Sequence, residues 1–275
     1  MNKKGQIAIF VIVAVVLIAA VILFFLIRTD VIEIPFIPTK SGDDFDFETE
    51  LEKCILDNEE LQESISQIVR QGGSSEPEFY YTNLNKNYEY LCYTNSYYET
   101  CVMQRPFPLQ HIEEEIKIAI NDEIQECFSK TKEKAKRDFE VSSSRMDWSV
   151  DFVQENMIFN FEASVTLTSK DGNKKRYNEF EVKKSSELYD LIMLASSILN
   201  YEARYGDSDI DSYMIFYPKI RVEKIKQGEG TTVYFVSDRD SCCKNSECNL
   251  EKPECETFNF AMRSWVLPPG YGLGY

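Results

Sequence analysis

Residue types and motifs that enzymes and metal sites commonly use are scarce or absent in this sequence. Its single histidine, His111, excludes Ser-His-Asp triads and clusters of histidine ligands in their usual forms. No C-x2-C pair occurs, although such pairs are typical of zinc sites. The S-x-x-K match from Ser129 to Lys132 has neither an S-D-N nor a K-T-G motif beside it. We therefore expect no enzymatic activity and no cofactor, and an envelope hydrolase is the least supported hypothesis.

Basic residues are also too few for a nucleic-acid-binding protein. The net charge is −16. Lys3, Lys4 and Arg28 contribute +3 in a segment without acids, so the remaining chain carries −19. Such a surface repels phosphate backbones, which excludes nucleic acid as a partner.

The longest apolar run, residues 6–27, lies near the N-terminus and contains no charged residue and no proline. As a helix it would extend about 33 Å, enough to cross a hydrocarbon core of about 30 Å. Lys3 and Lys4 precede it, so the positive-inside rule predicts a cytoplasmic N-terminus. The run is longer than the apolar core of a cleaved secretory signal, which favours an uncleaved anchor in the lipid bilayer.

These features divide the chain into four parts. Residues 1–28 are the predicted transmembrane anchor, and 29–46 form a juxtamembrane stalk in which Pro35 and Pro38 interrupt any helix. Residues 47–267 form the predicted extracytoplasmic domain, and 268–275 form a flexible tail.

Hydrophobic periodicity predicts an α+β fold for the extracytoplasmic domain, with antiparallel strands and about three helices. The helices are predicted over 47–70, 109–139 and 186–205. A Tyr-rich segment, 78–103, predicts three short strands. A meander of three strands is predicted from 148 to 182, and further strands at 213–226, 231–236 and 258–267. The tyrosines indicate either a sugar- or protein-binding face or an aromatic sheet surface packed on a helix.

Cysteines are the clearest indication of compartment. All eight follow the apolar run, and an even number outside the membrane predicts a disulfide framework: Cys54, Cys92, Cys101, Cys127, Cys242, Cys243, Cys248 and Cys255. Cys54 and Cys127 lie on the apolar faces of two predicted helices, which favours their pairing, and Cys92 and Cys101 lie on neighbouring predicted strands. The last four could bind zinc, but two local disulfides are favoured. Cys242–Cys248 with Cys243–Cys255, and the swapped pairing, remain open.

An acidic triplet, Asp207-x-Asp209-x-Asp211, resembles the start of a calcium-binding loop. The loop pattern also requires Gly and, at its twelfth position, Glu, where this chain has Ser212 and Pro218. A solvated acidic loop is the favoured interpretation, and a weak calcium site is the alternative.

Lys3-Lys4-Gly5-Gln6-Ile7 resembles the class III signal of archaeal type IV pilins, in which a prepilin peptidase cuts after the glycine. That resemblance implies processing between Gly5 and Gln6. The order of segments along the chain is similar to that of uncharacterised single-pass membrane proteins of DPANN-type archaea. These segments are the anchor, a cysteine-containing helix with Gln71-Gly72-Gly73, the Tyr-rich segment, a second cysteine-containing helix, the meander, a helix and the terminal strand. That family has no established activity to carry over.

From these features we expect a membrane-anchored, extracytoplasmic structural or interaction protein at the cell surface. Its partner would be a protein or a glycan, or another copy of itself. The alternative is a type IV pilin-like subunit, cleaved after Gly5 and assembled through its apolar helix.

Overall fold

The computed structural model describes residues 45–244, 247–250 and 255–268. Within these ranges it has an α+β fold with seven helices and four disulfides, so the predicted fold class is confirmed for the domain. In this described part, no helix combines the length and apolar character needed to cross a bilayer. The predicted anchor, with Gly5 and Gln6, lies outside the described residues.

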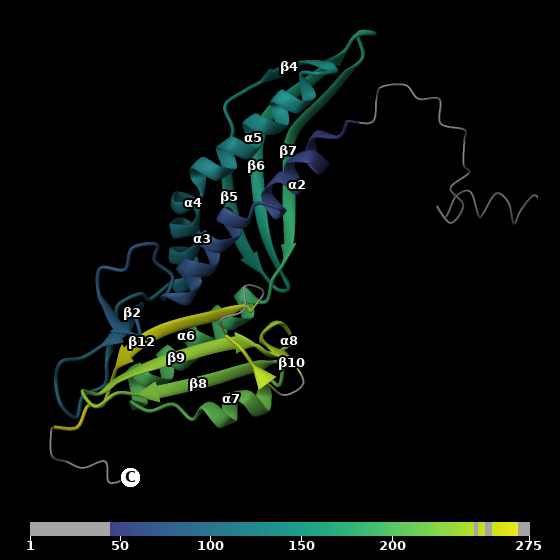
Figure 1. The fold of residues 1–275 in the computed structure, drawn as a ribbon. Coiled ribbons are helices and arrows are strands. Elements are labelled where there is room, and N and C mark those ends of the chain that lie inside the picture. Colours follow the sequence, from purple (N-terminus) through teal and green to yellow (C-terminus); the bar gives the residue numbers. More distant parts are fainter. Residues whose placement is uncertain (1–44, 245–246, 251–254, 269–275) are drawn as a thin grey trace, which may run out of the picture. The chain divides into compact units, whose positions relative to one another are not determined.

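The first sheet has four strands, β4 (Phe139–Ser143), β5 (Asp147–Val153), β6 (Asn156–Ser169) and β7 (Lys174–Ser185) (Figure 1). The long strand β6 pairs antiparallel with each of the other three. Alternate side chains of β5 and β6 are buried, as expected for a sheet with one face in the core. The predicted meander is confirmed as β5–β6–β7, whereas β4 begins at Phe139, where the periodicity predicts the end of a helix.

Four helices come before this sheet in the chain: α2 (Phe47–Leu56), α3 (Glu59–Arg70), α4 (Pro108–Ala119) and α5 (Asn121–Ala135). The prediction of one helix over 47–70 was wrong, because Asn58 caps a new helix by accepting a hydrogen bond from the Leu61 N–H at 3.2 Å. The predicted helix over 109–139 is likewise divided at Ile120, which leaves helical geometry and separates α4 from α5.

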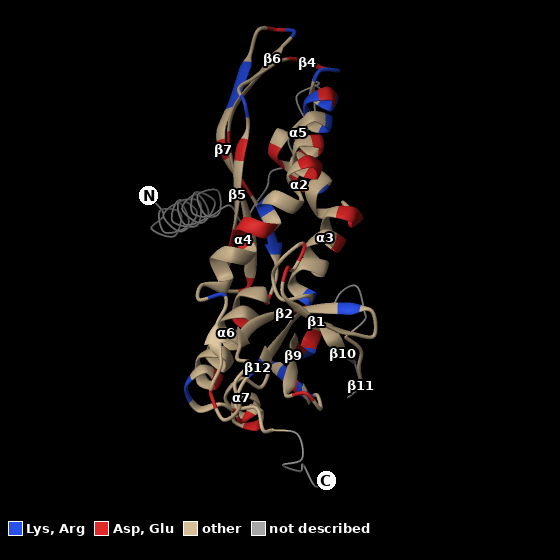
Figure 2. Cartoon of the chain, turned by 90° about the vertical axis from the view of Figure 1, so that its left-hand side faces the viewer, with Lys and Arg blue, Asp and Glu red and all other residues tan. Residues whose placement is uncertain are grey.

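Helices α2 and α5 lie against each other and are joined by the Cys54–Cys127 disulfide, as their apolar stripes predict. The rings of Phe47 and Phe128 meet edge to face with centroids 5.6 Å apart. Both helices carry acidic and basic residues (Figure 2), and the ion pair between Lys134 and Glu50 (2.8 Å) joins them.

The second sheet has six strands: β1 (Tyr80–Asn83), β2 (Lys86–Tyr93), β3 (Val102–Met103), β8 (Ile220–Lys226), β9 (Thr231–Asp238) and β12 (Thr257–Arg263). The order is β1-β2-β12-β9-β8, with β3 beside β2. All strand pairs in this sheet are antiparallel except the pair of β2 and β12, which is parallel. This pair joins a strand near the start of the domain to one near its end.

Helix α6 (Leu188–Tyr205) contacts β9 and β12, and ends at Gly206, whose φ of +92° gives the left-handed C-cap that the sequence predicts. Helix α7 (Ile210–Phe216) corrects a prediction, because a strand was expected from Tyr213. Asp209 caps this helix and directs the chain into it, and β8 begins only at Ile220. A short helix α8 (Arg239–Cys242) leads to the hairpin of β10 (Cys243–Lys244) and β11 (Glu247–Cys248).

One buried cluster contains side chains from both sheets and from the helices between them. Phe159 and Phe161 contribute from β6, and Phe258 and Phe260 contribute from β12; none is more than 1% exposed. The Tyr234 and Phe260 rings stack with centroids 5.2 Å apart. The six-stranded sheet and the four-stranded sheet therefore share a core within the described domain.

Candidate functional site

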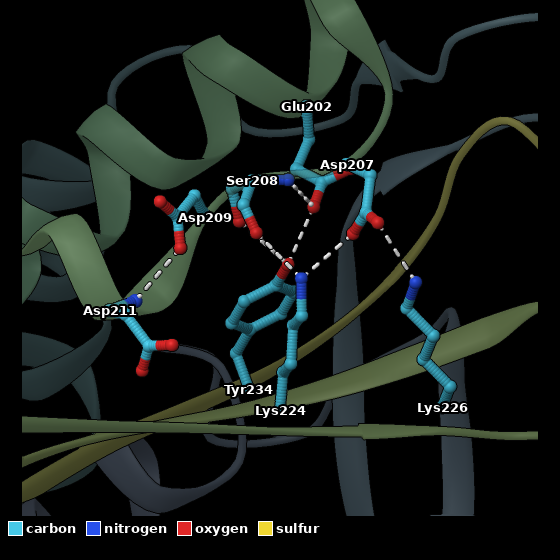
Figure 3. A network of polar contacts seen from close by, with 8 residues as sticks. All are labelled: Glu202, Asp207, Ser208, Asp209, Asp211, Lys224, Lys226 and Tyr234. Carbon is cyan, nitrogen blue, oxygen red and sulfur yellow. Dashed lines mark hydrogen bonds and ion pairs between the residues drawn. The ribbon is translucent and has the colours of Figure 1, made fainter.

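The structure gives the three carboxylates of the predicted calcium loop different partners (Figure 3). Asp207 accepts hydrogen bonds from Lys224 Nζ at 2.8 Å and from Lys226 Nζ at 3.0 Å. Burial alone would raise the pKa of Asp207, but the two lysines outweigh it and leave the pKa lowered. This carboxylate is therefore neutralised by residues of β8 instead of being available to a cation.

Asp209 and Asp211 serve the start of α7. Asp209 accepts from Ser212 Oγ at 2.6 Å and from the Asp211 N–H at 3.2 Å, and the hydrogen bond from Ser212 lowers its pKa. Asp211 lies in the first helical turn, where acids are favoured by the helix dipole. Among the residues that the structure describes, no group of three or more His, Cys, Asp or Glu side chains is arranged to hold a metal ion.

A buried polar network adjoins this loop and includes its residue Ser208 (Figure 3). Glu202, near the end of α6, accepts from Tyr234 Oη at 2.5 Å and from the Ser208 N–H at 2.9 Å. Glu202 is only 3% exposed and Tyr234 is fully buried, so desolvation raises the pKa of both groups. Sequence reasoning missed this network. The available signal was that Glu202 falls three and four residues after Leu199 and Ile198, on the buried face of α6.

The single histidine belongs to a second polar cluster. His111, in the first turn of α4, places Nε2 2.9 Å from Ser74 Oγ, and Ser74 donates to Glu89 Oε2 at 2.5 Å. Because the hydroxyl gives its one proton to Glu89, the histidine must donate to the serine. In a serine hydrolase the imidazole instead takes the serine proton. Arg105 pairs with Glu89 at 2.9 Å and completes a cluster that joins α4 to β2.

The S-x-x-K residues are likewise not assembled into a site. Ser129 is exposed on α5, and Lys132 Nζ lies 4.7 Å above the centre of the Phe128 ring. This lysine therefore makes a cation–π contact within its own helix.

The Tyr-rich segment divides into a packed part and an exposed part. Tyr88 and Tyr90 are buried in a small cluster with Val233 and Ala261 on the second face of the six-stranded sheet. The Tyr90 hydroxyl is 2.7 Å from Thr231 Oγ1, and the rings of Phe79, Tyr90 and Tyr93 contact one another. These residues form an aromatic sheet surface, as one of the two interpretations expects. Within the described residues the members of this cluster come from strands, so the surface is not packed on a helix as that interpretation also expects.

Three other aromatic residues are exposed at the ends of the same strands: Tyr97 (47%), Tyr98 (45%) and Trp265 (50%). We call them the aromatic loop surface. The Tyr98 N–H donates to the Val266 carbonyl at 2.9 Å, and the Trp265 N–H donates to the Glu99 carbonyl at 2.8 Å. Two chain segments more than 160 residues apart in sequence are therefore held together beneath the exposed rings.

The backbone of the aromatic loop surface is held in an unfavourable conformation. Tyr98 has a φ of +61° and Trp265 a φ of +48°, which costs bulky residues about 1–3 kcal/mol each. The Cys92–Cys101 disulfide closes the first segment, and Ser264 Oγ accepts from the Cys101 N–H and donates to the Glu202 carbonyl, both at 3.1 Å. A disulfide and a hydrogen-bond network thus hold the two backbone segments that carry the exposed aromatic rings.

The late cysteines adopt the swapped pairing, Cys242–Cys255 with Cys243–Cys248. Cys243 and Cys248 lie directly opposite each other on β10 and β11, so this hairpin selects the second bond and leaves Cys242 for Cys255. With Cys54–Cys127 and Cys92–Cys101, all eight cysteines are paired.

Comparisons with protein-family models, with curated proteins and with solved structures return no match.

Proposed function

We propose that this chain is a membrane-anchored, extracytoplasmic interaction protein whose contact site is the aromatic loop surface. The observation that supports it most is the pairing of all eight cysteines into four disulfides. Such frameworks persist outside the reducing cytosol. The apolar run over 6–27 supplies the anchor, and the lysines before it supply the orientation.

Tyr97, Tyr98 and Trp265 fit the role of contact residues for a physical reason. Tyrosine and tryptophan bring a large apolar area at a small cost in side-chain entropy, and they are enriched among residues that dominate interface binding energy. Because the surrounding backbone is already fixed, little further ordering is needed when a partner binds. The partner proposed is a protein or glycan of the cell envelope, or a second copy of the chain.

Membrane topology is tested on right-side-out vesicles from cells that express the full chain. Added protease should degrade the domain over 47–267 while a cytoplasmic marker stays intact. Thiol counting in the denatured, unreduced protein should find no free cysteine. A domain protected until detergent is added, or several reactive thiols, would contradict the proposed location.

The contact site can be tested with the protein's own fluorescence. The chain has two tryptophans: Trp148 is 3% exposed in the core and Trp265 is half exposed. Trp148→Phe leaves Trp265 as the sole indole reporter. We expect a change in Trp265 emission, and weaker acrylamide quenching, when soluble envelope glycans are titrated in or when the protein itself is concentrated. Emission that stays constant in every titration would refute the role of this surface.

The pilin-like alternative depends on Gly5 and Gln6. Removal of residues 1–5, seen as a mass loss in the intact protein together with assembly into filaments, would favour it. A chain that keeps Met1 and stays monodisperse in detergent would favour the anchored interaction protein.

A further inference from the structure

The Cys243–Cys248 disulfide differs from the other three in its exposure. Each of the others includes at least one cysteine that is 0–1% exposed, namely Cys127, Cys92 and Cys242. Cys243 and Cys248 are both partly exposed. Exchange with an external thiol requires access to the sulfur, so this bond is the one best placed to react.

The two sulfurs border a cavity of about 610 Å³, which is large enough to admit a small thiol. Its lining comes from α7, β8, α8 and the hairpin, and its charged members are Arg221, Glu223, Arg239 and Asp240. Two arginines and two acidic residues therefore line the same cavity as the disulfide that an incoming thiolate could attack.

Arg221 makes the two sulfurs unequal. Its Nη1 donates to Cys248 Sγ at 3.2 Å, while its Nε donates to Glu223 Oε1 at 2.6 Å. A guanidinium beside a sulfur favours the thiolate over the thiol, and a thiol with a lower pKa leaves faster in disulfide exchange. Cys248 is therefore the better leaving group, and Cys243 is the sulfur to be attacked.

We propose that Cys243–Cys248 is a thiol–disulfide exchange site that oxidises an external dithiol. One thiolate of the dithiol attacks Cys243 Sγ, the Cys243–Cys248 bond breaks, and its electron pair leaves on Cys248 Sγ beside Arg221. The second thiolate of the dithiol attacks the sulfur that is bonded to Cys243 and releases Cys243 as a thiolate. The dithiol loses two electrons and two protons, and the cysteine pair gains both.

The rest of the fold can persist when this bond opens. Its cysteines are only five positions apart, so it closes a short loop, whereas the neighbouring Cys242–Cys255 bond spans 13 positions. Cys242 and Cys255 are buried and hold α8 beside the residues that lead into β12. Reduction of Cys243–Cys248 would thus free the hairpin and leave this attachment in place.

The test uses the full chain in detergent, with dithiothreitol as the dithiol. At successive times the thiols are alkylated, and each cysteine peptide is quantified by mass spectrometry. We expect Cys243 and Cys248 to be alkylated roughly tenfold sooner than the six other cysteines, because only this bond is accessible on both sides. Reduction of all four bonds together, or only in denaturant, would overturn the proposal.

Substitutions that remove either the positive charge of Arg221 or the negative charge of Glu223 test whether charge beside the disulfide sets its rate of reduction. Arg221→Gln should slow reduction of this bond by roughly threefold to tenfold, and Glu223→Gln should accelerate it, because the leaving thiol's pKa contributes to the rate. Arg221→Lys, which keeps the positive charge, should retain most of the rate, and Arg176→Gln, an exposed arginine on β7, is the matched control. The proposal fails if the Arg221→Gln and Glu223→Gln rates both equal that of the unaltered chain.

Discussion

Removing the Cys54–Cys127 disulfide should destabilise the domain more than removing any of the other three. The cost follows from the length of chain that each bond closes, because a cross-link mainly restricts the unfolded state. Cys54 and Cys127 are 73 positions apart, and Cys243 and Cys248 are five apart. The chain-entropy relation then gives about 4.4 kcal/mol for the first bond and about 2.1 kcal/mol for the second.

The double variants Cys54→Ala/Cys127→Ala and Cys243→Ala/Cys248→Ala make the comparison without leaving free thiols. Residues 45–275 form one compact unit, so urea unfolding of this segment can be followed by the emission of buried Trp148. We expect the free energy of unfolding to fall about 2.3 kcal/mol further for the first variant than for the second.

Contacts between α2 and α5 that do not involve the disulfide should keep the native packing intact in the variant without it, so that the loss of stability reports on the cross-link. The Lys134–Glu50 ion pair and the Phe47–Phe128 contact do not involve sulfur, so α2 should stay docked when the bond is absent. Equal losses for the two double variants, or a larger loss for the short-range pair, would refute the loop-length reasoning.

Three further changes give expectations of different kinds. Burial raises the pKa of Glu202 in the folded state. The fold therefore loses about 1.4 kcal/mol of stability for each pH unit as pH rises from the ordinary carboxyl pKa of 4.5 to the raised pKa. In urea titrations Glu202→Gln should be more stable than the unaltered chain at pH 8 and about equally stable at pH 4. Gly206→Ala should lower the free energy of unfolding by at least about 1–2 kcal/mol in the same titrations, because φ is +92° and the new Cβ would lie 2.7 Å from the Trp265 Cβ. The control Gly228→Ala should be neutral, because its new Cβ meets nothing within 4 Å. Asp46→Ala removes the cap that accepts from the Thr49 N–H and also the acceptor of Lys175 Nζ and the Tyr177 hydroxyl. It should therefore lower the melting temperature, at a cost of at least about 1 kcal/mol.

Hydrophobic periodicity predicted the buried faces of the helices well and their ends poorly. The apolar stripe continues through Asn58 and through Ile120, because the helices on both sides of each break bury the same side of the chain. The breaks depend on local hydrogen bonds, such as the Asn58 cap, which leave the apolar pattern unchanged. The same cause explains α7, where Ile215 and Phe216 suggest a strand but are exposed on a helix that Asp209 caps.

The candidate sites were predictable to different degrees. Helix stripes predicted that Cys54 lies near Cys127, because this pair follows from local periodicity. The Cys92–Cys101 pairing was predicted as well, but from a strand around Cys101 that is wrong, since β3 begins only at Val102. Trp265 could not be placed beside Tyr98, since that contact depends on two turns with positive φ and on long-range pairing. Glu202 and Tyr234 also meet only through the tertiary packing of α6 on β9.

The parallel pairing of β2 with β12 also constrains the order in which the protein can fold during synthesis. Cys92 and Met262 are neighbours in that ladder although about 170 residues separate them in the chain. At a translation rate of about 5–20 residues per second, β2 would wait roughly 10–30 s for its partner to emerge. The meander of β5, β6 and β7 is complete long before then, so the nascent chain should acquire its four-stranded sheet first and close the six-stranded sheet last. Until that closure the edge of β2 that pairs with β12 is open, and an unpaired strand edge is a site at which chains can aggregate.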